Sequence, residues 1–213
     1  MRHEGLIYPC FCTRRDIQRE IENAGLAPHI EDMPEIYPGS CRGLSEQQRQ
    51  KRMADNTPFA WRLDVQAAWQ RVGDVSWQDS DACSHAIHPD LNDAVIGRKD
   101  IGISYHLAVV IDDAMQDISH VIRGEDLKSS TGLHRLLQAL LGLPSPVYIH
   151  HPLLCNAASE RLAKRNGAPS LRQLRTSGVS PDTLRRLLMR HGVSSPPVWI
   201  EGFGLDDGFS LDD

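Results

Sequence analysis

The stretch YPCFCT, residues 8–13, places two cysteines one residue apart in a chain that has only five. Two side chains this close in sequence are poorly placed for a mutual disulfide, but they can reach one metal ion together. An odd number of cysteines also argues against a disulfide framework. The stretch therefore predicts a metal-binding knuckle near the start of the fold.

A second stretch, IYPGSC at residues 36–41, ends in a further cysteine. Its Pro-Gly pair favours a turn, which would bring Cys41 back toward Cys10 and Cys12. Zinc takes four tetrahedral ligands in structural sites, so three thiolates leave one position to fill. The candidates for this position are Tyr37, His29 and a water molecule.

A rival group of metal-ligand residue types occurs at Cys83, His85 and His88. These side chains fall in a polar segment, where histidines are usually solvated. The three cysteines of the first group are therefore the favoured metal ligands.

The composition is that of a soluble globular protein, with 40% hydrophobic and 24% charged residues in 213. No apolar run approaches the length of a membrane span, and no signal peptide is predicted, so we expect a cytoplasmic protein without a membrane partner. The net charge is −5, but residues 161–190 carry eight basic side chains and one acid. This basic segment suits either a polyanion such as ATP or tRNA, or a solvated helical face.

Capping boxes at Ser45–Gln48 and Ser170–Gln173, a stop at Gly142 and apolar spacing predict the helices. Their ranges are 13–23, 45–56, 131–141, 170–176 and 181–191. Alternation and β-branched residues predict strands at 59–65, 104–111, 118–122 and 147–149, with a loop-rich segment at 74–93. Strands that alternate with helices indicate an α/β fold with some parallel sheet.

Several motifs follow one another in a characteristic order: Cys-x-Cys, a 24-residue gap, Tyr-x-x-x-Cys, then SYHLAVVIDD, HVIRGEDL and RLAKRNGA. Together they resemble the glutamyl-tRNA synthetase family of class I enzymes, from about Gly5 to about His191. Within that family the chain is most similar to the glutamyl-queuosine tRNA(Asp) synthetases, short members without an anticodon-binding domain. The resemblance implies part of a Rossmann-like catalytic domain with an inserted zinc knuckle.

This resemblance also implies a division of the chain. Residues 1–58 would form the zinc-knuckle insertion and its flanking helices, and 59–150 the second half of the catalytic α/β domain. Residues 151–200 would form the basic ATP loop and a helical region, followed by an acidic tail at 201–213.

The family's functional residues fall on defined positions of this sequence. Its structural zinc ligands correspond to Cys10, Cys12, Tyr37 and Cys41. Its glutamate-recognising residues correspond to Tyr105 and Arg123, and an arginine offers a planar fork that suits a carboxylate.

The family's ATP loop has the usual pattern Lys-Met-Ser-Lys-Ser, and RLAKR at residues 161–165 stands in its place. Lys164 corresponds to the lysine that contacts the ATP phosphates. Arg161, Ala163 and Arg165 depart from the pattern, but the positive charge is retained, as phosphate contact requires.

The implied substrates are glutamate, ATP with Mg²⁺, and tRNA(Asp) bearing queuosine, and the implied assembly is a monomer. Adenylation needs no side-chain nucleophile, so no catalytic side chain is assigned.

These 213 residues contain no His-x-Gly-His motif, which the family uses to grip ATP. We therefore expect an N-terminally truncated chain with impaired activity. The alternatives are a fragment of a discriminating glutamyl-tRNA synthetase and a non-catalytic zinc knuckle that binds nucleic acid.

Overall fold

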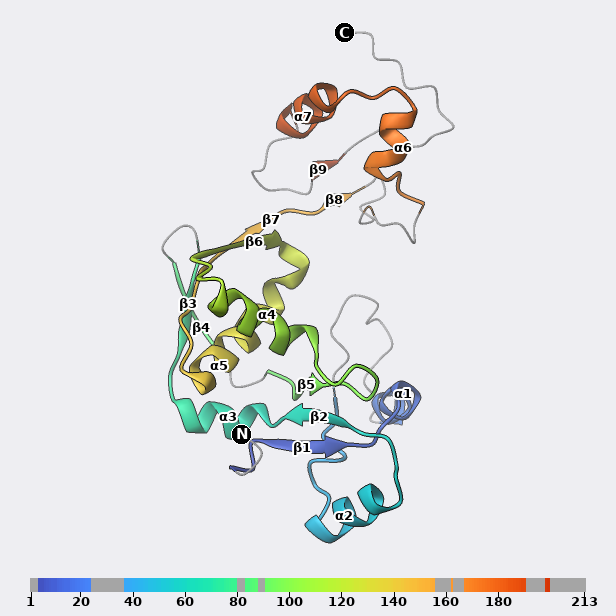
Figure 1. Ribbon diagram of the computed structural model, residues 1–213, viewed down its shortest axis with the longest axis vertical. Helices are drawn as coiled ribbons and strands as arrows, with labels where there is room; N and C mark the ends of the chain where they lie inside the picture. Colours follow the sequence, from blue (N-terminus) through green and yellow to red (C-terminus); the bar gives the residue numbers. More distant parts are fainter. Residues whose placement is uncertain are drawn as a thin grey trace. The chain divides into compact units, whose positions relative to one another are not determined.

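The computed structural model describes residues 4–23, 37–79, 83–87, 91–155, 162, 167–190 and 198–199 (Figure 1). The chain divides into two compact units. The first comprises Met1–Val121 and Ser130–Tyr148, and the second comprises Ile122–Ser129 and Ile149–Asp213. None of the described helices is long and apolar enough to cross a membrane.

A three-stranded sheet lies in the first unit, in the order β1 (Ile7–Cys10), β2 (Ala60–Leu63), β5 (Ala94–Gly97). Both pairings are antiparallel, and β1 and β2 run in register from Ile7 opposite Leu63 to Cys10 opposite Ala60. Pro9 is tolerated in β1 because this strand lies at the edge, where a missing N–H costs no second ladder bond.

Three helices pack beside this sheet: α3 (Val65–Val72), α4 (Tyr105–Met115) and α5 (Thr131–Leu141). Helix α5 contacts both α3 and α4. Asp64 caps α3 by accepting the Ala67 N–H at 2.9 Å, and α5 ends at Gly142, whose left-handed φ of 65° suits glycine.

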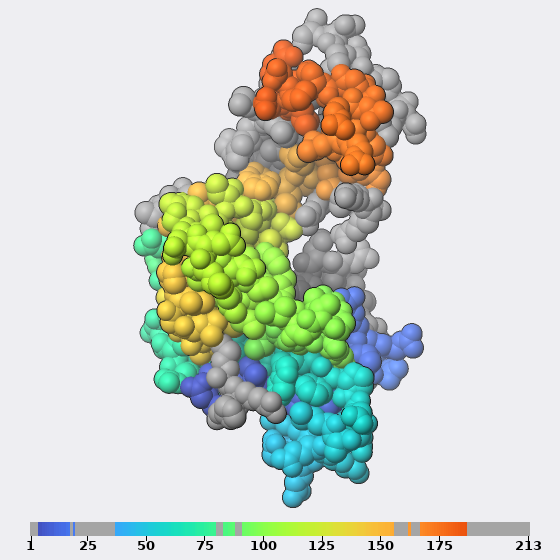
Figure 2. All heavy atoms as spheres, in the orientation of Figure 1, coloured from blue at the N-terminus to red at the C-terminus, as the bar shows by residue number. Residues whose placement is uncertain are grey.

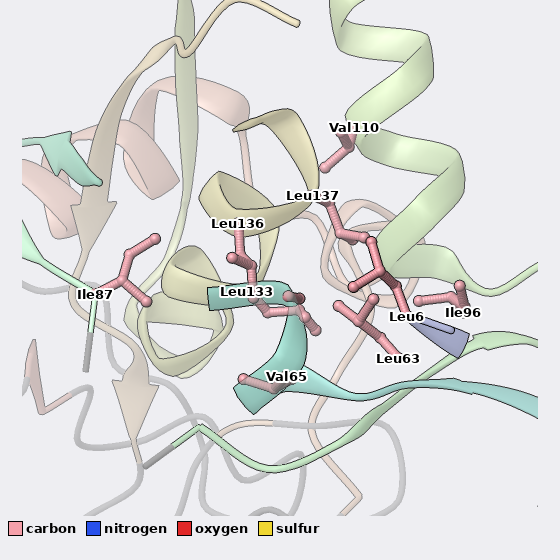
Figure 3. Packing of buried hydrophobic residues seen from close by; sticks show 10 residues of the cluster. Leu6, Leu63, Val65, Ile87, Ile96, Val110, Leu133, Leu136 and Leu137 are labelled. Carbon is pink, nitrogen blue, oxygen red and sulfur yellow. The ribbon is translucent and has the colours of Figure 1, made fainter. Parts of the chain in front are cut away.

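Aliphatic side chains from these elements form the main core of the first unit, which we call the aliphatic cluster (Figure 3). Leu136 and Leu137 project from α5 toward side chains from the sheet and from the two other helices. The buried members are Leu6, Leu63, Val65, Ala68, Ile87, Ile96, Val110, Leu133, Leu136 and Leu137.

The prediction of a strand at residues 104–111 is wrong, because the structure has helix α4 there. Ser104 is the N-cap and accepts the Leu107 N–H at 3.4 Å. The segment is rich in valine and isoleucine, which favour strands. Helical spacing nevertheless lets Leu107 and Val110 share the face that packs on the aliphatic cluster.

The segment 74–93, predicted to be loop-rich, contains an antiparallel hairpin of β3 (Ser76–Gln78) and β4 (Ser84–Ala86). Trp77 anchors this hairpin, since its side chain is buried and stacks on the His85 ring with centroids 4.1 Å apart.

Strands β6 (His120–Gly124) and β7 (Val147–His151) pair, and each runs from the first unit into the second. The second unit also contains β8 (Leu154–Cys155), β9 (Val198–Trp199), α6 (Leu171–Thr176) and α7 (Pro181–Arg190). The 3₁₀ helix η1 (Glu125–Ser130) follows β6. The predicted helices at 131–141, 170–176 and 181–191 are thus confirmed within one residue.

Among the described strands, parallel pairing occurs between β8 and β9 and at the bridge between Asp79 and Tyr148. The three-stranded sheet and the β3–β4 hairpin are antiparallel.

Candidate metal centre and substrate-binding residues

The three cysteines predicted to bind metal come together in the first unit. Strand β1 ends at Cys10 and the chain turns so that Cys12 precedes helix α1 (Arg14–Asn23). The ligand atoms of Cys10, Cys12 and Cys41 all lie within 4.8 Å of one another, and the sulfurs of Cys12 and Cys41 are 3.4 Å apart. The predicted convergence is confirmed.

A tight turn returns Cys41 to the pair. Gly39 has a φ of 85°, a conformation that favours glycine, and its carbonyl accepts the Arg42 N–H at 2.8 Å. The Phe11 N–H then donates to the Cys41 sulfur at 3.4 Å. Helix α2 (Glu46–Ala54) follows, with the predicted capping box between Ser45 and Gln48 present.

Tyr37 lies in the same cluster. Its side chain is buried, its hydroxyl oxygen accepts the Cys41 N–H at 2.8 Å, and the same oxygen lies 3.5 Å from the Cys10 sulfur. Of the candidates for the fourth ligand, His29 falls outside the described residues. The Tyr37 hydroxyl therefore lies beside the cysteines, and its role as the fourth ligand stays a prediction.

The protonation pattern of this cluster is uneven. A hydrogen bond from Cys41 holds the pKa of the Cys10 thiol well below its usual range, against the opposing effect of burial. Burial raises the pKa of Cys12 and of Tyr37, and the hydrogen bond to Cys10 raises that of Cys41. The Cys10 thiol is therefore the group of this cluster that loses its proton most readily.

The donor set fits zinc. Tetrahedral zinc with Zn–S bonds of about 2.3 Å would place two sulfurs about 3.8 Å apart, close to the spacing of these three cysteines. Three sulfurs and one phenol oxygen supply four donors, and zinc binds thiolates by displacing their protons. In such a site the ion would hold the two chain segments together.

A cavity of about 290 Å³ opens beside the cluster. Cys12 and Cys41 line it together with Asp16, Arg19 and Arg52, so basic side chains face the space next to the predicted metal ligands.

The rival group at residues 83–88 does not assemble among the described residues. Cys83 is exposed, His85 stacks on Trp77 and approaches the Asp79 carboxylate at 3.6 Å, and His88 lies outside the described residues.

Tyr105, predicted to recognise glutamate, is the first residue of α4 and is 51% exposed. Figure 2 shows α4 and the loop before it, in green, at the surface of the first unit. Behind the Tyr105 ring, His106 Nδ1 lies 3.0 Å from Nε2 of His134, which is buried on α5. Both imidazole rings are steeply inclined to the Tyr105 ring, with centroids 5.6 and 6.0 Å from its centroid.

Arg123 lies on the part of β6 that belongs to the second unit, and its side chain is 9% exposed. Its Nε donates to Nε2 of His150 on β7 at 3.3 Å. This bond orients the guanidinium plane, which is what a two-point contact with a carboxylate requires. Lys164 and its basic neighbours Arg161 and Arg165 lie outside the described residues.

Several polar residues around these sites were not predicted. Asp93 is buried and accepts the Tyr8 hydroxyl at 2.5 Å and the Val65 N–H at 3.0 Å. Arg62 stacks on the ring of Tyr37. Since these partners are far apart in sequence, no local pattern marks them.

The chain is similar to known proteins over most of its length. The family described as tRNA synthetases class I (E and Q), catalytic domain, matches residues 1–200. The chain is 41% identical over 193 residues to Glutamyl-Q tRNA(Asp) synthetase of Rhodobacter capsulatus, covering 86% of this chain and 67% of that protein. It is 40% identical over 188 residues to the protein of the same name from Nocardia farcinica, covering 88% and 56%. The chain thus spans only just over half to two thirds of these relatives.

Two solved structures have a similar fold. One is a glutamate tRNA ligase from Elizabethkingia meningosepticum in complex with its amino acid, with 26% identity and a TM-score of 0.57 over 76% of this chain and 32% of that one. The other is glutamate-tRNA synthetase from Elizabethkingia anophelis, with 26% identity and a TM-score of 0.59 over 78% and 34%. By the match over residues 1–200, the chain belongs to the class I tRNA synthetases of the glutamate and glutamine type, in their catalytic domain.

Proposed function

We propose that this chain takes part in the ATP-dependent activation of glutamate and its transfer to queuosine in tRNA(Asp). The observation that carries the proposal is the 41% identity over 193 residues to a protein named for this activity. The exposure of Tyr105 and the orientation of Arg123 by His150 support it, because they suit the glutamate-binding roles that the resemblance implies for these two residues.

In the first step, a carboxylate oxygen of glutamate attacks the α-phosphorus of ATP, and pyrophosphate leaves as glutamyl-adenylate forms. Arg123 would hold a glutamate carboxylate through its planar fork, and Tyr105 would orient the amino or carboxylate group. Lys164 would stabilise the charge that develops on the phosphates, with Mg²⁺ accompanying ATP.

In the second step, a hydroxyl of the tRNA acceptor attacks the activated carbonyl, and AMP leaves. The chain contributes positioning and charge stabilisation in both steps, and no covalent intermediate on a side chain is needed. Zinc held by Cys10, Cys12, Tyr37 and Cys41 would have a structural role.

We expect the 213 residues alone to activate glutamate poorly, because they contain no His-x-Gly-His motif. Adenylation needs both phosphate-binding elements in one geometry. The test therefore uses the chain alone and the chain joined to the part of the Rhodobacter capsulatus relative that lies outside the match.

The measurement is the transfer of radiolabelled glutamate to three RNAs: tRNA(Asp) with queuosine, the same tRNA without it, and tRNA(Glu). We expect the joined protein to label only the queuosine-bearing tRNA. Labelling of tRNA(Glu) instead would establish the glutamyl-tRNA synthetase alternative, and no labelling of any RNA would contradict both.

Residue roles are tested in the same protein. Arg123→Lys keeps the charge but loses the fork, so we expect the KM for glutamate to rise by at least tenfold. Arg98→Ala is the matched control, because Arg98 is exposed and pairs with Asp100. An unchanged KM in Arg123→Lys would remove Arg123 from the glutamate site.

A further inference from the structure

Arg62 on β2 lies beside the predicted metal ligands. Its guanidinium carbon is 3.8 Å from the centroid of the Tyr37 ring, and its Nη1 donates to the Asp93 carbonyl at 2.8 Å. The β2–β5 register shifts between Trp61 and Arg62, and such an irregularity re-aims a side chain. The Arg62 guanidinium thus contacts both the phenol ring and the backbone just before β5.

The positive charge of Arg62 is not balanced by a carboxylate. Within the part of the chain that the structure describes, Arg62 forms no ion pair, and the nearby carboxylates of Asp64 and Asp93 are approached by Arg42 instead, at 3.9 and 3.5 Å. Among the residues that the structure describes, the Nε of Arg62 also has no hydrogen-bond partner, although it is buried. A half-buried cation with an unused donor is costly unless negative charge lies nearby.

The cysteine cluster can supply that negative charge. The Arg62 guanidinium is stacked on the ring of Tyr37, whose hydroxyl oxygen lies 3.5 Å from the Cys10 sulfur. Three thiolates and one phenolate would carry four negative charges, which a divalent zinc ion only half neutralises. That charge would lie beside the Arg62 guanidinium, which is stacked on the Tyr37 ring.

We propose that Arg62 is the charge-balancing residue of the metal centre, which it contacts through the Tyr37 ring, and that it thereby slows the release of zinc. This inference rests on the proposal that the three cysteines and Tyr37 bind zinc. It assigns Arg62 no contact with the metal, glutamate or ATP.

The test measures zinc release from the purified 213-residue chain to an excess of a chromophoric chelator. Loss of residues that support metal ligands typically weakens metal binding by about 10–100-fold. We expect Arg62→Gln to release zinc about 10–100 times faster than the parent chain. Arg62→Lys should fall between the two, because it keeps the charge but not the planar stack.

Arg52→Gln is the matched control. Arg52 also lies over an aromatic ring of the same cluster, that of Phe11 at 5.4 Å, but Phe11 is not a predicted ligand. We expect its zinc release to match that of the parent chain.

A second readout separates charge balance from a general structural role. If Arg62 acts through the loaded metal centre, Arg62→Gln should lower the melting temperature of the zinc-loaded chain. The melting temperature of the metal-free chain should stay within about 2 °C of the parent, well under the shift that a loss of about 1 kcal/mol causes. Unchanged zinc release in Arg62→Gln would overturn the inference. Zinc release from Arg52→Gln as fast as from Arg62→Gln would also overturn it, and so would equal release rates in Arg62→Lys and Arg62→Gln. A loss of stability in metal-free Arg62→Gln as large as in the zinc-loaded variant would overturn it as well. A parent chain that binds no zinc would overturn the metal proposal itself, and the inference with it.

Discussion

Two buried clusters lie in the first unit, and they are stabilised in different ways. The aliphatic cluster consists of side chains without polar atoms, and burial alone stabilises it. The second cluster, which we call the cysteine cluster, consists of Tyr8, Cys10, Phe11, Ile17, Tyr37 and Cys41. Four of these six side chains carry a hydroxyl or a thiol, so their burial is favourable only when these groups have partners.

Strand β2 separates the two clusters. Leu63 is fully buried in the aliphatic cluster, whereas its neighbour Arg62 stacks on Tyr37 in the cysteine cluster. Successive residues of a strand point to opposite faces, which explains how one short strand serves both. Equal burial therefore has unequal requirements: the aliphatic cluster needs only packing, whereas the thiols and hydroxyls of the cysteine cluster need polar partners, a role that we propose for zinc.

Removal of one thiolate should have the largest effect. Cys41→Ser should abolish zinc binding, because two thiolates and one phenol remain and a serine hydroxyl is a weak ligand in place of the third thiolate. Structural zinc contributes about 10–16 kcal/mol in small peptides, so the loss of the site should be large. Elemental analysis of the purified protein, expected to give near one zinc per parent chain, measures this.

Cys83→Ser is the control for that change, since Cys83 is exposed and outside the cluster. If the Cys41→Ser protein kept its zinc, Cys41 would not be a metal ligand. The proposed difference between the two clusters would then be wrong.

Truncation in the aliphatic cluster should cost stability and leave zinc in place. Leu136→Ala should lower the free energy of unfolding by about 2–5 kcal/mol through lost burial and an internal cavity. Denaturant unfolding followed by circular dichroism measures it, with Leu141→Ala on the same helix as control, because Leu141 is 39% exposed. Loss of zinc from Leu136→Ala under native conditions would show that the clusters are not independent.

Removal of the phenol oxygen should weaken zinc binding without abolishing it. Tyr37→Phe keeps the ring under Arg62 and the three thiolates, so we expect a loss of at least about tenfold in zinc affinity, at the low end of what supporting residues contribute. Competition with a chelator of known affinity measures the change.

Tyr8→Phe is the matched control, because the Tyr8 hydroxyl donates to Asp93 and not to a cysteine. Equal zinc affinity in Tyr37→Phe and the parent would show that the fourth ligand is not Tyr37.

The smallest effect should come from a helix cap next to the cysteine cluster. Ser45→Ala removes the cap of α2, which typically costs about 1 kcal/mol. Because α2 has no buried residue, the loss should appear as local opening, measured by amide hydrogen exchange within α2. Gln47→Ala serves as control on an exposed position of the same helix, and equal exchange in the two variants would contradict the role of the cap.

Part of the candidate site could be predicted from the sequence. The short Cys-x-Cys spacing and the turn before Cys41 indicated a metal cluster, because ligands on tight turns are constrained by local geometry. The contacts of Arg62 with Tyr37 and Asp93, and the contact between His106 and His134, could not be predicted. In each case the two partners lie 25 or more residues apart, and no local sequence pattern connects them.

By itself, the sequence determined features whose partners lie within a few residues. The capping boxes at Ser45 and Ser170 and the end of α5 at Gly142 are all where the sequence predicts them, since each depends on backbone groups of the same turn. Only the tertiary structure decided that residues 104–111, although rich in strand-favouring residues, form a helix. There the gain from packing Val110 against the aliphatic cluster outweighs a local preference worth a fraction of a kcal/mol per residue.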